Sequence, residues 1–261
     1  MPYYSFKVYS TGKTVLTKQF TTQDCLDLHF LLANKDYIGV DIFCQQKYEE
    51  YSNDKTRLNC FDKFLYLFSQ KILSHTFDLV VSHQGEKEKI KKYVSLVKLY
   101  NDIESCSFQL KESYKQGDLE IIYGIPYDLN CSNNYIFYSI KTNNCVYENI
   151  ENLDSNTASS LPIKLYTNIQ NMQVENNKKI NSKYFEQCFL KELDFSNNTF
   201  LYFLDFIYSE NVGDFFMLCY NLNKEFHVHF NHIKTITMRE LFLLVDTINT
   251  SIKEKKAKSN E

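Results

Sequence analysis

The stretch from Tyr4 to Lys35 constrains the fold more than any other part of the chain. Its sequence, YSFKVYSTGKTVLTKQFTTQDCLDLHFLLANK, predicts two short strands joined by a tight turn and followed directly by a helix. Gly12 lies between the strands, where a hairpin needs a residue that tolerates positive φ. Thr21 or Thr22 is placed to cap the helix, with Asp24 three residues after Thr21 as in a capping box. The rest of the chain must supply the surface against which this unit packs.

The composition favours helices with a few hairpins. The chain has 261 residues, of which 44% are hydrophobic and 23% charged, as in globular proteins. It contains only 6 Gly and 3 Pro, which are too few for a sandwich or barrel built from many tight turns. We therefore predict an α+β fold, with an N-terminal β-hairpin followed by a helical region, then a C-terminal helix pair, a β-hairpin and a final helix.

The charge pattern argues against nucleic acid and membrane partners. The net charge is −3, and Arg occurs only at Arg57 and Arg239. Arg is the usual residue for bidentate contacts to phosphates and guanine edges, so we expect no nucleic acid partner. The longest apolar stretch, residues 200–208, is too short to span a bilayer and contains Asp205. We therefore expect no membrane span.

The eight cysteines indicate free thiols. No two form a C-x-x-C pair, so the sequence contains no local zinc-knuckle or redox motif. Cys25, Cys188 and Cys219 lie in apolar runs, where a thiol behaves as a small hydrophobe. Residues 1–5 lead straight into a predicted strand rather than a signal peptide. We expect synthesis in a reducing cytoplasm.

Helical periodicity marks two more segments of the first half, residues 36–50 and 58–73. The second is the stronger, because its apolar residues recur every three or four positions. Lys63, Gln70 and Lys71 lie on its other face. It is expected to be a core helix built on these residues: Phe61, Phe64, Leu65, Phe68 and Ile72.

The middle of the chain mixes strands and helix. Residues 76–82 are a strand candidate, and residues 86–99 are assigned to a helix by propensity. Residues 107–110 and 119–123 are expected to pair through a turn, and residues 135–140 form another short strand.

An Asn- and Ser-rich segment, residues 150–161, is the expected exposed loop or domain boundary. It divides an N-terminal hairpin-plus-helices region with a β extension, residues 1–150, from a C-terminal helical region with a β-hairpin, residues 151–252. Residues 253–261 are expected to be a frayed polar tail. One compact unit is the alternative.

The C-terminal region is expected to begin with helices at residues 183–193 and from Asn197 or Asn198 to Tyr208. Apolar alternation then predicts a hairpin of residues 215–220 and 226–230. A final helix over residues 238–252 has its apolar residues on one stripe: Leu241, Leu244, Val245 and Ile248.

Gly12-Lys13-Thr14 resembles the end of a phosphate-binding loop. That loop requires a first glycine five positions before Gly12, where this chain has Lys7. A hairpin turn explains the glycine better.

The local concentration of candidate metal ligands is His227, His229 and His232. Alternation along the strand expected at residues 226–230 would put His227 and His229 on one face, with Cys219 on the facing strand. No carboxylate or second cysteine stands at a diagnostic offset. We therefore favour polar-face histidines on a half-exposed hairpin, and we expect no metal, no cofactor and no catalytic residue.

The tyrosines outside the helical stripes suit protein–protein contact, because Tyr is enriched at interfaces. They are Tyr3, Tyr4, Tyr48, Tyr51, Tyr135 and Tyr138.

The N-terminal unit also resembles a known family. The turn Ser10-Thr11-Gly12-Lys13, then Val15 and Phe20 with a helix directly after, is similar to the baseplate hub subunit and hub assembly proteins of T4-like contractile-tailed phages. That family shows roughly s-T-G-K-x-V-x-x-R-P-F, and here Lys18-Gln19 replaces Arg-Pro. The segments at residues 60–68 and 125–126 resemble further parts of the family.

The resemblance implies a non-enzymatic structural or assembly protein of the baseplate hub. Its partners would be other baseplate or tail proteins, and its location would be the virion or, during assembly, the host cytoplasm. A tail assembly chaperone absent from the finished virion is one alternative. A cytoplasmic metal or thiol enzyme using the C-terminal hairpin is another, although no family-type signature surrounds any cysteine or histidine.

Overall fold

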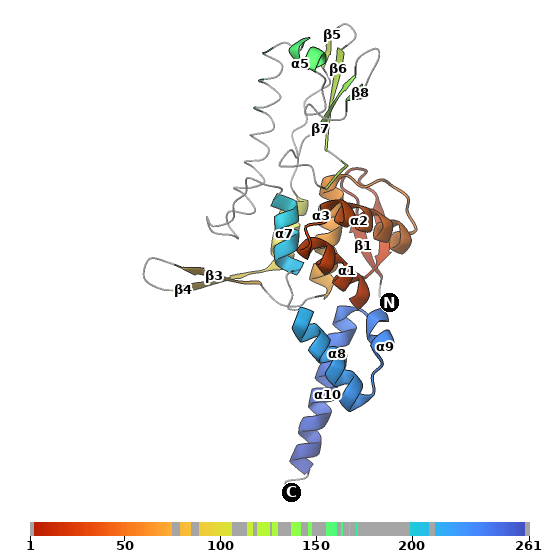
Figure 1. Ribbon diagram of the computed structural model, residues 1–261, viewed down its shortest axis with the longest axis vertical. Helices are drawn as coiled ribbons and strands as arrows, with labels where there is room; N and C mark the ends of the chain where they lie inside the picture. The colour runs from red at the N-terminus through yellow and green to blue at the C-terminus, as the bar shows by residue number, and fades with distance from the viewer. Residues whose placement is uncertain are drawn as a thin grey trace.

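The computed structural model describes residues 3–74, 79–84, 89–105, 114–116, 119–125, 127–129, 137–141, 146–147, 155–160, 199–208 and 212–258, together with residues 163, 167 and 171. Figure 1 shows a helical body with a sheet at one end, further helices at the other and a hairpin extending sideways. The described part is mostly helical and begins with a two-stranded antiparallel hairpin, which agrees with the expected α+β class.

The N-terminal hairpin forms as expected. Strands β1 (Tyr3–Lys7) and β2 (Thr14–Lys18) pair antiparallel, with Phe6 opposite Val15. Gly12 has a φ of 68°, so the glycine serves the turn. Lys13 forms an ion pair with Asp54 at 3.0 Å. These roles account for both residues without a phosphate.

Three helices follow, close to the predicted bounds: α1 (Thr22–Ala33), α2 (Tyr37–Ser52) and α3 (Cys60–Ser74). Thr21 and Asp24 cap α1 with a complete capping box, which confirms that prediction.

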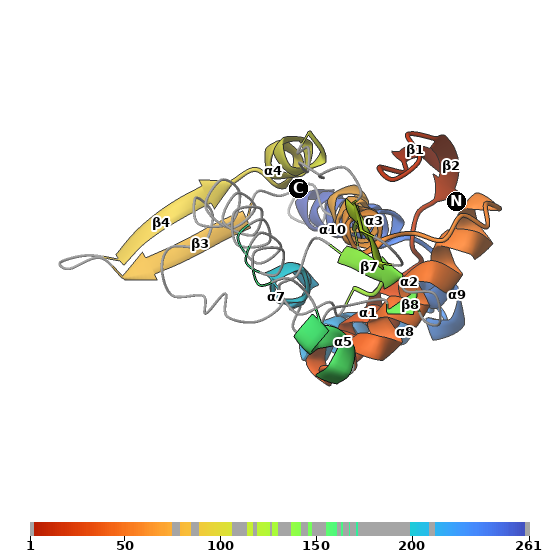
Figure 2. The same ribbon diagram turned by 90° about the horizontal axis from the view of Figure 1, so that it is seen from above.

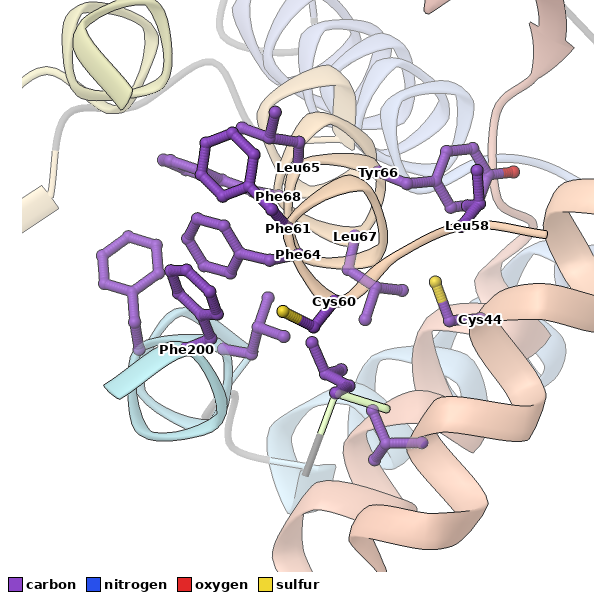
Figure 3. Close-up of a cluster of buried hydrophobic side chains, with 14 of the residues drawn as sticks. Cys44, Leu58, Cys60, Phe61, Phe64, Leu65, Tyr66, Leu67, Phe68 and Phe200 are labelled. Atoms are coloured by element: carbon purple, nitrogen blue, oxygen red, sulfur yellow. The ribbon is translucent and has the colours of Figure 1, made fainter. Parts of the chain in front are cut away.

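Helix α3 is the centre of the body and is buried on all sides over residues 60–71. In Figure 3 its phenylalanines point toward Phe200, whereas Tyr66 points to the opposite side. There Tyr66 meets the hairpin through the Phe6 ring, at 5.3 Å between centroids. The sequence places Lys63, Gln70 and Lys71 on a separate polar face, yet all three are buried and contact other elements.

Helix α7 (Thr199–Tyr208), predicted correctly, packs into the same core as α3. The rings of Phe64 and Phe200 stack with centroids 4.4 Å apart. The Tyr208 hydroxyl donates a hydrogen bond to the Leu67 carbonyl at 2.7 Å. One hydrophobic core therefore draws on residues from both sides of the proposed boundary at residue 150, and the boundary itself lies outside the described residues and stays a prediction.

The segment assigned to a helix at residues 86–99 is wrong in its first half. Strand β4 (Lys89–Val94) pairs with β3 (Leu79–Gln84), and helix α4 (Leu96–Glu104) follows. The sequence KIKKYV contains β-branched and aromatic residues, and pairing with β3 outweighs a local helix propensity. Figure 2 shows this hairpin extending away from the helical body.

A four-stranded antiparallel sheet stands at one end, in the order β5 (Tyr114–Gln116), β6 (Leu119–Gly124), β7 (Phe137–Lys141) and β8 (Val146–Tyr147). The predicted strands at residues 119–123 and 135–140 correspond to β6 and β7. The partner of β6 expected at residues 107–110 lies outside the described residues, and among the described strands β5 and β7 pair with β6.

Helix α5 (Ser155–Ser160) lies within the segment expected to be a loop, so residues 150–161 are helical in part. The helix expected at residues 183–193 lies outside the described part of the chain.

The predicted C-terminal hairpin is wrong. Residues 215–220 belong to helix α8 (Val212–Phe226), and residues 226–230 lead into helix α9 (Phe230–Thr235). Short apolar runs suit a strand or a buried helix equally, and here helical spacing decides. Phe215, Cys219 and Leu222 are four and three residues apart and share one buried helix face.

Helix α10 (Met238–Lys258) is longer than predicted, because the tail expected to fray is helical as far as Lys258. Lys, Ala and Glu are good helix formers, which favours this extension. Across the described ranges, none of the helices combines the length and the apolar character that crossing a membrane requires.

Candidate functional site

The candidate metal ligands are not brought together. His227 has a φ of 54° in the turn after α8, and His229 is the N-cap residue of α9. Both are exposed, as is His232, whereas Cys219 is buried in the core under α8. The strand face that would have aligned the histidines does not form. Among the described residues, no group of three or more His, Cys, Asp or Glu side chains could hold a metal ion.

The buried thiols of Cys44 and Cys219 are poorly suited to act as nucleophiles. Burial raises the pKa of the Cys219 thiol to about 11. Burial also raises the pKa of Cys44, whose thiol donates to the Lys63 carbonyl at 3.6 Å. A nucleophilic cysteine requires the opposite, a depressed pKa and access to substrate.

Asp24 is a buried carboxylate engaged in structural contacts. Its Oδ2 accepts hydrogen bonds from the Thr21 amide and hydroxyl at 2.8 and 2.7 Å and from the Tyr51 hydroxyl. Its Oδ1 pairs with the Lys47 ammonium at 2.9 Å. Burial and the bond to Asp24 raise the pKa of Tyr51. The cluster fixes the start of α1 against α2.

A second ion pair joins the buried Lys63 to the half-buried Asp41 and holds a segment beside the four-stranded sheet. The Lys63 ammonium bonds both Asp41 oxygens at 2.8 and 2.7 Å and the Tyr127 carbonyl at 2.8 Å. Asp41 also accepts from the Leu129 amide at 2.7 Å. These contacts join α2 and α3 to residues 127–129.

The strongest candidate for function is an apolar face on α8. Phe216, Met217 and Tyr220 lie close together on the helix, and their exposed fractions are 44%, 59% and 58%. They turn away from the buried face of the same helix, since Phe215 and Cys219 occupy the opposite side. The Phe230 ring of α9 lies beside Phe216, with centroids 6.3 Å apart. We call these four residues the α8 face.

Cations border the α8 face. The Lys224 ammonium lies 5.8 Å from the centre of the Tyr220 ring, and the Lys234 ammonium lies 4.7 Å from that of Phe230. Exposed aromatic and Met side chains with a polar rim are typical of protein–protein interfaces, and Met adapts to irregular partners. The geometry therefore suits protein contact.

The tyrosines expected at an interface differ in exposure. Tyr3 is exposed, Tyr4 is half-buried, and Tyr48 and Tyr51 are buried in the core. The side chains of Tyr135 and Tyr138 lie outside the described residues. The sequence interpretation missed the α8 face because it assigned residues 215–220 to a strand. Helical spacing would have revealed it.

The chain matches no protein-family model, no curated protein and no solved structure.

Proposed function

We propose that this chain is a non-enzymatic structural or assembly protein of the baseplate hub in a contractile-tailed phage. It acts through contacts with other baseplate or tail proteins, in the virion or in the host cytoplasm during assembly. The observation that carries the contact role is the α8 face, where three large apolar side chains of one helix turn toward solvent.

The baseplate part of the proposal is supported by the likeness of residues 10–20 to the hub family. The protein-contact part is supported independently by the way the described ionic groups are used. The Asp24 and Asp41 clusters bind protein groups, and Cys44 and Cys219 are buried. Neither arrangement favours metal or thiol chemistry.

The contact role is tested by changing the α8 face. Met217→Ser together with Tyr220→Ser should abolish co-purification with baseplate or tail proteins from phage-infected cells, with identification by mass spectrometry. Leu243→Ser on α10 is the matched control, because Leu243 is also exposed, at 58%, but lies outside the α8 face. Retention of the same baseplate proteins by the double variant would refute the contact role.

Retention in the particle separates the two phage roles. A structural subunit is present in purified virions, whereas a transient assembly chaperone is present in infected cells and missing from the virion. Mass spectrometry of both samples distinguishes them. Co-purification with proteins unrelated to a tail would remove the baseplate role altogether.

A further inference from the structure

The two edges of the N-terminal hairpin differ. The outer edge of β2 is covered at its C-terminal end by Gln70, whose side-chain amide acts like a neighbouring strand. It accepts from the Phe20 amide at 2.8 Å and donates to the Lys18 carbonyl at 3.1 Å. Helix α2 also packs beside β2. Covering an edge in this way prevents pairing with another strand.

Among the residues that the structure describes, none covers the outer edge of β1 in this way. The Val8 amide donates to the Lys13 carbonyl at 2.8 Å, so alternation directs the main chain of Tyr4 and Phe6 toward β2. The main-chain groups of Tyr3, Ser5 and Lys7 therefore point outward. All three residues are exposed, and within the described ranges no residue hydrogen-bonds to their main chain.

We propose that the β1 edge binds the β1 edge of a second copy of this chain, in an antiparallel pair centred on Ser5. This register overlaps the two strands over their full length, from Tyr3 to Lys7. It aligns the outward main-chain groups of both strands and forms about six main-chain hydrogen bonds. The product is a four-stranded sheet related by a two-fold axis, as in isologous dimers.

The side chains fit this register. Tyr3 lies opposite Lys7 of the second copy, Lys7 lies opposite its Tyr3, and the two Ser5 side chains meet at the axis. The lysines are kept apart from each other, and each faces an aromatic ring that attracts a cation. Tyr3 already lies beside a lysine within one chain, with the Lys18 ammonium 5.9 Å from its ring centre. Moving the centre to Lys7 would instead set two lysines opposite each other, which is destabilising.

The β1 edge is separate from the α8 face. A test of dimerisation through the β1 edge is therefore independent of a test of the proposed baseplate role.

Oxidative cross-linking of the full chain tests the register. In the proposed dimer the two residues at position 5 form a hydrogen-bonded pair with about 5.5 Å between their Cα atoms, which is within disulfide reach. Ser5→Cys should give a covalent dimer that reductant reverses. Lys7→Cys would face Tyr3, and Leu16→Cys lies on β2, away from the proposed β1 interface, so both should give at least about tenfold less dimer. The unmodified chain controls for its native cysteines.

A charge substitution gives a second, independent readout by sedimentation velocity. Tyr3→Glu places a carboxylate opposite Lys7 and should strengthen association roughly tenfold, since it acts at two symmetric pairs. Tyr3→Lys places like charges together and should weaken association by a similar factor. Circular dichroism confirms that each variant folds. Absence of the Ser5→Cys dimer, equal dimer yields from all three cysteine variants, or equal effects of Glu and Lys at position 3 would overturn the proposal.

Discussion

Thr21 and Thr237 form an isolated antiparallel bridge, although they are far apart in the sequence. Each is the capping residue of a helix, α1 and α10 respectively, and each bonds a carboxylate three residues later, Asp24 or Glu240. The Thr22 amide donates to the Ile236 carbonyl at 2.8 Å. The starts of two helices are thereby joined, and α10 is fixed to the N-terminal body at its capped end.

Removing the cap of α10 should destabilise the chain moderately. Thr237→Ala deletes the hydroxyl that bonds both the amide and the carboxylate of Glu240, and we expect a loss of about 1 kcal/mol in the free energy of unfolding. Urea denaturation measures it. Thr247→Ala, the same change on the exposed side of α10, should stay within about 0.5 kcal/mol of the parent. Equal effects of the two changes would contradict the capping role.

The shared core predicts a large effect at Phe200. Phe200→Ala removes a fully buried ring stacked on Phe64 and should cost about 3–5 kcal/mol in the free energy of unfolding. Phe206→Ala on the same helix is the control, because Phe206 is 36% exposed and should cost less than about 1.5 kcal/mol. If α7 were not part of the core in solution, denaturation would show similarly small losses for both variants.

The tyrosines with raised pKa values predict loss of stability at alkaline pH. Burial is the first cause that raises the pKa of each of these residues above its ordinary value of 10.0: Tyr4, Tyr48, Tyr51, Tyr66 and Tyr100. A raised pKa in the folded state means that the unfolded chain loses its protons first. Stability is therefore fully present below about pH 10 and is lost as the pH rises further.

Denaturation at pH 8 to 11 should show this fall in the unfolding free energy. Tyr100→Phe should make the fall shallower by about 1.4 kcal/mol per pH unit above about pH 10, the value for one proton. Absorbance at 295 nm should show these tyrosines ionising together with unfolding. An unfolding free energy that stays constant over this range would contradict the prediction.

The N-terminal unit was predictable because its determinants are local. The turn at Gly12 and the capping box of Thr21 and Asp24 each depend on neighbours within a few residues, so their pattern is visible in the chain. Hydrophobic spacing likewise located α2, α3 and α7.

Distant pairing could not be predicted in the same way. The sequence predicted that the polar side chains of α3 face solvent, because their partners are far along the chain. Those partners are Asp41 for Lys63 and the end of β2 for Gln70.

The prediction of a C-terminal hairpin was wrong for a different reason. Short apolar runs fit two periods, and the small core under α8 selected the helical one. The prediction that His227 and His229 share one strand face was wrong because it depended on that hairpin. The α8 face was missed for the same reason.

The ion pair of Lys63 and Asp41 predicts an asymmetry between its two partners. The Lys63 side chain is 4% exposed, and that of Asp41 is 21% exposed, so only the carboxylate has substantial access to water. Asp41→Ala leaves the Lys63 ammonium buried, and of the hydrogen bonds described above it keeps only the one to the Tyr127 carbonyl. This variant should cost about 3–5 kcal/mol in the free energy of unfolding. Lys63→Met fills the same space, and Asp41 keeps both solvent access and the Leu129 amide. We expect this variant to cost about 1–2 kcal/mol. Urea denaturation of both variants measures the difference, and a larger loss for Lys63→Met would show that the carboxylate, rather than the ammonium, is the group that depends on the pair.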